Sequence, residues 1–178
     1  MNSANPKPIL CLLISVMLFS FLGMAIDRPL FPFIVRGERS ERVEITEAIN
    51  LYNKILTDIY VSDGVPKLLN ELPATKQVRH GLFRDIGHLQ ALDRILICDN
   101  ASMAVAHIDW RSPRSVDVVV YEEWNYAYRR RGDRALTAPV KGLGIGIRYH
   151  LVRTRNRWIV SGWEPYDVRP ANAKEFKY

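Results

Sequence analysis

The chain has 178 residues, a formal net charge of +6, and a composition with 48% hydrophobic and 25% charged residues. This balance is typical of a globular protein and excludes a chain that is disordered throughout. The positive charge is too small and too dispersed to predict a nucleic-acid partner, although it favours an acidic partner or an anionic lipid surface. Cys98 is the only cysteine outside the first apolar stretch, which excludes an intramolecular disulfide and a Cys-based metal site in the remainder.

An uncharged apolar run occupies residues 9–26, from Ile9 to Ile26, and Lys7 precedes it. At about 1.5 Å per residue, such a run is just long enough to cross the hydrocarbon core of a membrane as a helix. We consider two interpretations, a retained signal anchor and a signal peptide cleaved after the small residues Gly23 and Ala25. The arginines that follow the run would keep the domain in the cytoplasm by the positive-inside rule, but glutamates accompany them. We expect a single-pass membrane protein with an extracytoplasmic domain, or a secreted or periplasmic protein after cleavage.

Changes in composition divide the chain into four parts. The predicted parts are a signal anchor or signal peptide (1–28), a connector (29–40), one folded domain (41–166) and a C-terminal tail (167–178). The third part is long enough to bury a hydrophobic core.

The first part of the domain predicts helices. Apolar residues recur every three or four positions between residues 43 and 60, which is typical of an amphipathic helix, and Asp63-Gly64 ends it. Residues 65–72 predict a short helical turn stopped by Pro73, and residues 75–92 predict a third helix.

The second part of the domain predicts strands rich in Val, Ile, Tyr and Trp. The predicted strands are 95–98, 103–110, 116–128, 143–153 and 157–164, with a turn at Asp99-Asn100 between the first two. Even-numbered residues of 116–128 share one face of the strand, and odd-numbered residues share the other. Long neighbouring strands must twist and curl, and the preceding helices are available to cover the concave face. The predicted fold class is therefore α+β, with N-terminal helices packed on a curved antiparallel β-meander.

This order of elements resembles the NTF2-like (cystatin-like α+β) cone. The segment VDVVVYEEWNYAYRR and the later segment GIRYHLVRTRNRWIVSGWEP are similar to the C-terminal strands of the inner-membrane-side domain of ARC6-like proteins of plastids and cyanobacteria. The shared pattern is an acidic–aromatic strand, a Tyr-x-Leu-Val-Arg strand, and Arg-Trp before a final apolar strand. These positions are residues 122–128, 149–153 and 157–163. The resemblance covers about residues 41–166 and implies an NTF2-like fold.

The resemblance also implies a pocket, because enzyme members of the superfamily use a carboxylate as a general base near an oxyanion donor. Glu122 and Glu123 are the pocket carboxylate candidates. Their possible partners are Tyr126, Tyr128, Tyr149 and His150. A carboxylate buried beside aromatic rings would have a raised pKa and could move a proton near neutrality. The alternative is that these glutamates point to solvent or pair with an arginine on the next strand.

An aromatic row and a basic end are the candidate binding surfaces. Trp124, Tyr126 and Tyr128 recur at every second residue, and they either form a binding face or pack as core and rim residues. An antiparallel meander would bring five arginines together at one end of the sheet, and they are Arg111, Arg114, Arg153, Arg155 and Arg157. The run Arg129-Arg130-Arg131 would lie at the opposite end. The basic end either docks on anionic headgroups or an acidic protein, or is simply solvated.

No sequence motif predicts a catalytic nucleophile, a cofactor or a metal centre. His107 and Asp109 share a strand face, but no third ligand accompanies them. We therefore expect a non-enzymatic binding module that is held at a membrane through residues 9–26 or exported, and that serves as an accessory or assembly component of an envelope complex. Its expected partner is a protein or anionic lipid, and no nucleic acid. The alternatives are a pocket enzyme of the isomerase or dehydratase type and a carrier of an apolar ligand.

Overall fold

The computed structural model describes residues 39–155 and 157–166; the predicted membrane segment, the connector up to residue 38 and the predicted tail lie outside this range. The helices are α2 (Arg39–Val61), α3 (Pro66–Glu71) and α4 (Lys76–Ala91). The strands are β1 (Arg94–Ser112), β2 (Ser115–Arg130), β3 (Val140–Thr154) and β4 (Arg157–Pro165). Within the described residues, no helix is both long enough and apolar enough to span a membrane.

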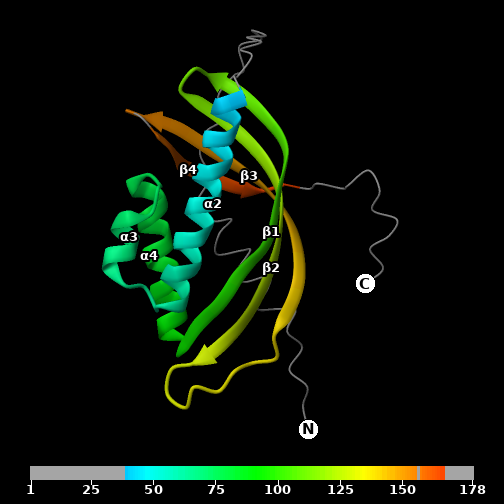
Figure 1. Cartoon of the computed structure of the whole chain (residues 1–178). Helices are drawn as coiled ribbons and strands as arrows, with labels where there is room; N and C mark the ends of the chain where they lie inside the picture. Colours follow the sequence, from blue (N-terminus) through cyan, green and yellow to red (C-terminus); the bar gives the residue numbers. More distant parts are fainter. Residues whose placement is uncertain (1–38, 156, 167–178) are drawn as a thin grey trace. The chain divides into compact units, whose positions relative to one another are not determined.

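The four strands form one antiparallel sheet in the order β1-β2-β3-β4, so the predicted meander is confirmed. Figure 1 shows the sheet curling around α2, with α3 and α4 beside α2 on the same side of the sheet. The segment before α4 also covers part of the β4 edge. There the Val160 amide donates to the Pro73 carbonyl, and the Thr75 amide donates to the Val160 carbonyl, each at 2.9 Å.

Strand β1 corrects one prediction, because Asp99-Asn100 is not a turn. Both residues belong to a continuous strand and pair with Asn125 and Trp124 of β2. The register shifts between Asn100 and Ser102, so the extra residue Ala101 forms a bulge. The Asn125 side chain donates a hydrogen bond to the Asp99 carboxylate at 3.0 Å, which supports the strand across this irregularity.

The core lies between the helices and the inner face of the sheet, and the predicted strand faces are confirmed. Even-numbered residues of β2 point inward, and Val116, Val118 and Val120 are all 0% exposed. Each side of the core supplies further apolar residues at 0% exposure: Ile45, Ile49 and Ile59 from α2, Leu151 from β3 and Val160 from β4. Burial of this continuous apolar layer is the main contribution to folding.

On the outer face, the start of β3 passes directly beneath an aromatic side chain of β2. A Cβ atom at position 144 would overlap the hydroxyl of Tyr121, so only glycine allows the ring to lie there. Gly142 has φ +65°, in the left-handed region that favours glycine. The two glycines therefore shape the start of β3 in different ways, Gly144 through a close approach and Gly142 through its backbone conformation.

Trp158 tests the core packing. Its side chain is 2% exposed and packs edge-to-face on Trp110, with ring centroids 5.8 Å apart. We expect Trp158→Ala to lower the free energy of unfolding by about 3–5 kcal/mol in urea titrations followed by circular dichroism. Trp158→Phe should cost clearly less, because it keeps a ring and removes an indole N–H that has no hydrogen-bond partner among the described residues. A loss below about 1 kcal/mol for the alanine variant would contradict this packing role.

Candidate functional site

A glutamate is buried in the interior of the domain. Glu122 on β2 is 0% exposed. Its Oε1 accepts hydrogen bonds from Asn53 Nδ2 at 2.6 Å and from the Tyr149 hydroxyl at 3.0 Å, and its Oε2 accepts one from Trp124 Nε1 at 2.8 Å. The four residues form what we call the Glu122 network.

Three secondary-structure elements position the Glu122 network. Glu122 and Trp124 are two residues apart on β2, so both point to the inner face. Asn53 follows Tyr52 on the buried side of α2, where its own exposure is 3%. Tyr149 pairs with Val118 across the β2–β3 ladder, and its long side chain extends along the inner face to reach Glu122. The network therefore ties one helix to two strands.

Burial governs the ionisation of this network. Loss of solvation raises the pKa of Glu122 above its ordinary value, and the hydrogen bonds from Trp124, Asn53 and Tyr149 offset only part of that effect. The pKa of Tyr149 is also raised, first by burial and then by the neighbouring Glu122 charge. The Tyr149 hydroxyl therefore stays protonated and donates, as a neutral partner of the carboxylate.

The expectation that Glu122 points to solvent or pairs with an arginine is wrong. The β2 alternation places it inward, and three neutral donors replace the water that it would otherwise bind. A raised pKa would suit a general base, but a substrate would have to displace one of these donors to reach the carboxylate. The Glu122 network as observed connects α2 with β2 and β3. Glu123 is half-buried on the opposite face of β2.

The structure gives each residue of the aromatic row its own set of contacts. Trp124 donates to Glu122, and Tyr128 is buried with the Arg94 guanidinium 5.5 Å from its ring centroid. Tyr126 packs edge-to-face on Tyr128, with centroids 6.0 Å apart. The interpretation of these residues as core and rim aromatics describes their positions, and a binding role for them stays a prediction.

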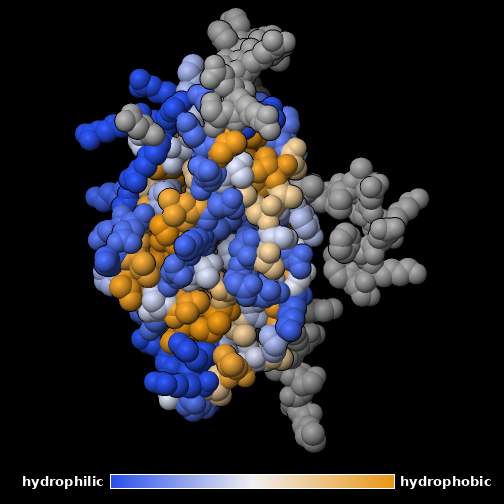
Figure 2. Space-filling model, viewed as in Figure 1, coloured by the Kyte–Doolittle hydropathy of each residue, from blue (hydrophilic) through white to orange (hydrophobic). Residues whose placement is uncertain are grey.

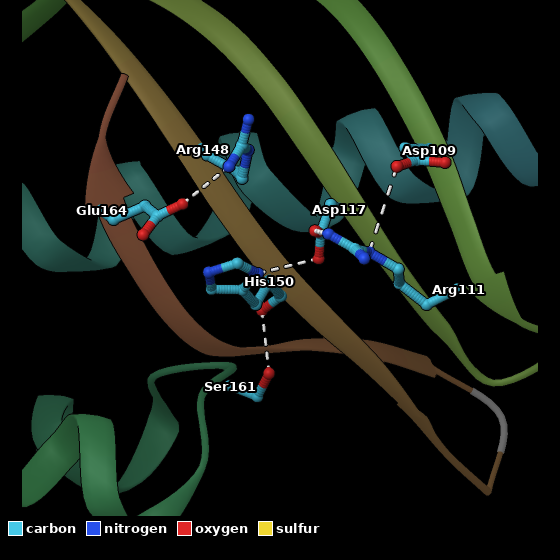
Figure 3. A network of polar contacts seen from close by, with 7 residues as sticks. All are labelled: Asp109, Arg111, Asp117, Arg148, His150, Ser161 and Glu164. Atoms are coloured by element: carbon cyan, nitrogen blue, oxygen red, sulfur yellow. Dashed lines mark hydrogen bonds and ion pairs between the residues drawn. The ribbon is translucent and has the colours of Figure 1, made fainter. Parts of the chain in front are cut away.

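A second polar cluster lies on the outer face of the sheet (Figure 3). Asp117 has a side chain only 7% exposed, and it receives the Arg111 guanidinium on Oδ2 and His150 Nδ1 on Oδ1, the latter at 2.7 Å. Burial raises the pKa of Asp117, but the hydrogen bonds from His150 and Arg111 outweigh it and leave the pKa below its ordinary value. His150 therefore lies on the opposite face from Glu122 and on the same face as the other carboxylate candidate, Glu123.

Ser161 adjoins this outer cluster without completing a catalytic triad. Its hydroxyl donates to the backbone carbonyl of His150 at 3.0 Å, and not to the imidazole ring (Figure 3). A nucleophilic serine needs a base within hydrogen-bond reach of its own hydroxyl. Asp117 and His150 form this cluster because they are paired across β2 and β3. The sequence alone does not specify that strand register, so it could not predict the cluster.

The predicted basic end contains two kinds of arginine. Arg111 pairs with Asp117, and Arg153 pairs with Glu41 at 2.8 Å and with Glu44 at 3.4 Å. The remaining three, Arg114, Arg155 and Arg157, are exposed, and no carboxylate in the described part of the chain forms an ion pair with them. At the other end, Arg131 pairs with Asp63, and Arg130 pairs with Asp133 at 2.7 Å.

Two further candidate groups have structural explanations. Cys98 is 8% exposed, and burial raises the pKa of its thiol to about 12, so it is a buried apolar residue and not a reactive thiolate. Within residues 39–155 and 157–166, no three His, Cys, Asp or Glu side chains are placed to hold a metal ion.

Comparison with known proteins supports the fold. No protein-family model and no curated protein matches the sequence. The intermembrane-space region of the chloroplast protein ARC6 matches with a TM-score of 0.56 and 10% identity, over 68% of this chain and 92% of that chain. A ketosteroid isomerase-like protein from Erwinia carotovora atroseptica matches with a TM-score of 0.46 and 9% identity, over 70% and 94%. An NTF2-like protein involved in plasmid conjugation matches with a TM-score of 0.47 and 15% identity, over 75% and 52%.

The chain has an NTF2-like fold, as its strand pattern predicted. The similarity to the ARC6 region covers nearly all of that domain, and the helices followed by a four-stranded meander account for the match. Identities of this size establish architecture and do not transfer an activity.

Two substitutions separate the structural and ionisation effects of Glu122. Glu122→Leu should lower the free energy of unfolding by about 3 kcal/mol or more, because three buried donors lose their acceptor. Glu122→Gln should cost much less, since an amide oxygen still accepts and the Asn53 side chain can rotate its amide. Equal losses from the two variants, measured by chemical denaturation at pH 7, would contradict the network's role.

The same pair has a pH signature. The folded pKa of Glu122 lies above its ordinary value of 4.5, so the folded chain retains a proton that the unfolded chain releases between those two values. The free energy of unfolding of the native chain therefore decreases as the pH rises through that window, and Glu122→Gln should remove this decrease.

The outer cluster has the opposite pH signature. Because the folded pKa of Asp117 lies below 3.8, its contribution is present above that value and is lost as the pH falls through the folded pKa. Asp117→Asn should lower stability at pH 7 by about 1–2 kcal/mol and flatten the acid limb of the stability curve. Unchanged acid limbs in the two chains, measured by urea titrations between pH 2 and 7, would contradict this linkage.

Proposed function

We propose that this chain is a non-catalytic binding module, held at a membrane through residues 9–26 or exported, that serves as an accessory or assembly component of an envelope complex. The observation that carries the proposal is the saturated Glu122 network. The carboxylate that a pocket enzyme would use is 0% exposed and already accepts three hydrogen bonds. Apolar side chains from helices and strands form one continuous core, so we assign binding to the outer surface.

The helical side of the domain offers apolar surface for a protein partner. Figure 2 shows hydrophobic patches between hydrophilic residues on the side of the molecule that bears the helices. Phe83 of α4 is 61% exposed, while Leu82 and Ile86 of the same helix are buried in the core. A large aromatic side chain in that position contributes nothing to the core and suits an interface, where aromatic residues are enriched.

Site-specific crosslinking in the membrane-retained full chain tests this function. A photoreactive amino acid at position 83 should give one discrete adduct with an envelope protein. The same group at position 136, a loop site where leucine is 66% exposed, should give none or much less. Glu122→Gln should leave the adduct in place. Loss of the biological activity of a stably folded Glu122→Gln chain, with no adduct at position 83, would favour a pocket enzyme instead.

A further inference from the structure

Three separate segments meet at one end of the domain, which we call the arginine end. The Arg153 amide donates to the Arg114 carbonyl at 2.8 Å, which joins the β1–β2 hairpin to the end of β3. The Arg153 side chain reaches Glu41 at 2.8 Å, which joins the same point to the first turns of α2. Figure 1 shows the beginning of α2, this hairpin and the β3–β4 turn at a single end of the molecule.

The arginine end carries excess positive charge. Its members are Arg42, Arg114, Arg153, Arg155 and Arg157, against Glu41 and Glu44, so five positive and two negative charges leave +3. Arg153 binds both glutamates, and its guanidinium also lies 5.6 Å from the Trp158 ring centroid. The acidic groups are therefore held by one arginine, and the other four are exposed without an ion pair in the described residues.

The backbone conformation at position 155 does not explain why an arginine occupies it. It occupies the β3–β4 turn with φ 49°, in the left-handed region where glycine and asparagine are favoured over arginine. Arg134, at the opposite end, is also exposed and has φ 59°. The two positions share residue type, exposure and backbone conformation, so they form a matched pair that differs in location.

The chain that precedes α2 enters the domain at the arginine end. The predicted membrane segment ends at Ile26, and residues 27–38 separate it from Arg39, the first residue of α2. Twelve residues span at most about 40 Å even when fully extended. A membrane attachment through residues 9–26 would therefore keep the arginine end within about 40 Å of the bilayer.

We propose that the arginine end docks on the anionic phospholipid headgroups of the membrane that holds the chain. This inference rests on the membrane attachment in the proposed function, and it adds the orientation and the lipid chemistry. Guanidinium groups bind phosphate through paired N–H donors, and several of them on one surface give a salt-sensitive attraction to an anionic leaflet. Asp109 and Asp117 both lie beside Arg111, and these three groups together add one negative charge, so the net charge is still +2 when they are counted with the arginine end.

Hydrogen exchange of the full chain in lipid nanodiscs tests the docking directly. Amides of Ser112, Arg114 and Ser115 and of residues 154–157 should exchange more slowly in discs with 30% phosphatidylglycerol than in pure phosphatidylcholine discs, and 0.5 M salt should abolish the difference. The variant with Arg114→Ser, Arg155→Asn and Arg157→Ser should lose this protection. The control with Arg130→Ser, Arg134→Asn and Lys141→Ser removes the same charge at the other end and should keep it. Identical exchange in the two kinds of disc would overturn the proposal. An acidic protein would then be the partner to test at this end.

Retention in the discs separates this proposal from the membrane attachment. A chain that leaves both kinds of disc would refute the attachment, and sedimentation with phosphatidylglycerol vesicles would then decide the lipid proposal. Each arginine near an anionic surface contributes roughly fivefold in affinity, so the arginine-end variant should bind about 100-fold more weakly than the native chain. Equal weakening in the control variant would show that net charge alone acts, and would overturn the assignment to this end.

Discussion

The architecture depends on one constraint, that a carboxylate placed inside a hydrophobic core must be surrounded by donors. Glu122 meets that constraint with groups from a helix and two strands, and these elements cannot separate without leaving a charged or polar group unpaired. Tyr52 extends the same region, because its ring packs edge-to-face on Tyr149 at 5.9 Å between centroids. Apolar burial supplies most of the favourable free energy, whereas the network specifies how α2 lies against the sheet.

Polar groups in the interior and on the exterior of the domain differ in how they are paired. The interior polar groups of the Glu122 network are occupied by one another. The exterior is itself divided. On the outer sheet face, Asp117 holds Arg111 and His150, whereas at the arginine end Arg114, Arg155 and Arg157 have no such partner in the described residues. The distribution of ion pairs, and not the net charge of the chain, distinguishes the two surfaces.

Much of the fold was predictable because its elements follow simple periods. The three- and four-residue recurrence marked α2, and the alternation Val116-Val118-Val120 marked the inner face of β2. The prediction of a turn at Asp99-Asn100 was wrong, because residues that favour turns also occur in strands beside a bulge. The environment of Glu122 was beyond sequence reasoning, since its partners Asn53 and Tyr149 lie 69 and 27 positions away and meet it only through tertiary packing. The pairing of His150 with Asp117 was not predicted for a related reason, because the register of β3 against β2 is not specified by the sequence.

The two edges of the sheet are not equivalent. Residues Pro73 to Thr75 occupy backbone groups of Val160 in β4, while β1 is the other edge strand of the sheet. Edge-to-edge growth into a fibre needs two open edges on every molecule, so that each copy can both accept and offer a strand. Blocking one edge interrupts that propagation. Any pairing through β1 would then end with two copies, so the Pro73–Thr75 segment limits edge-to-edge association to pairs.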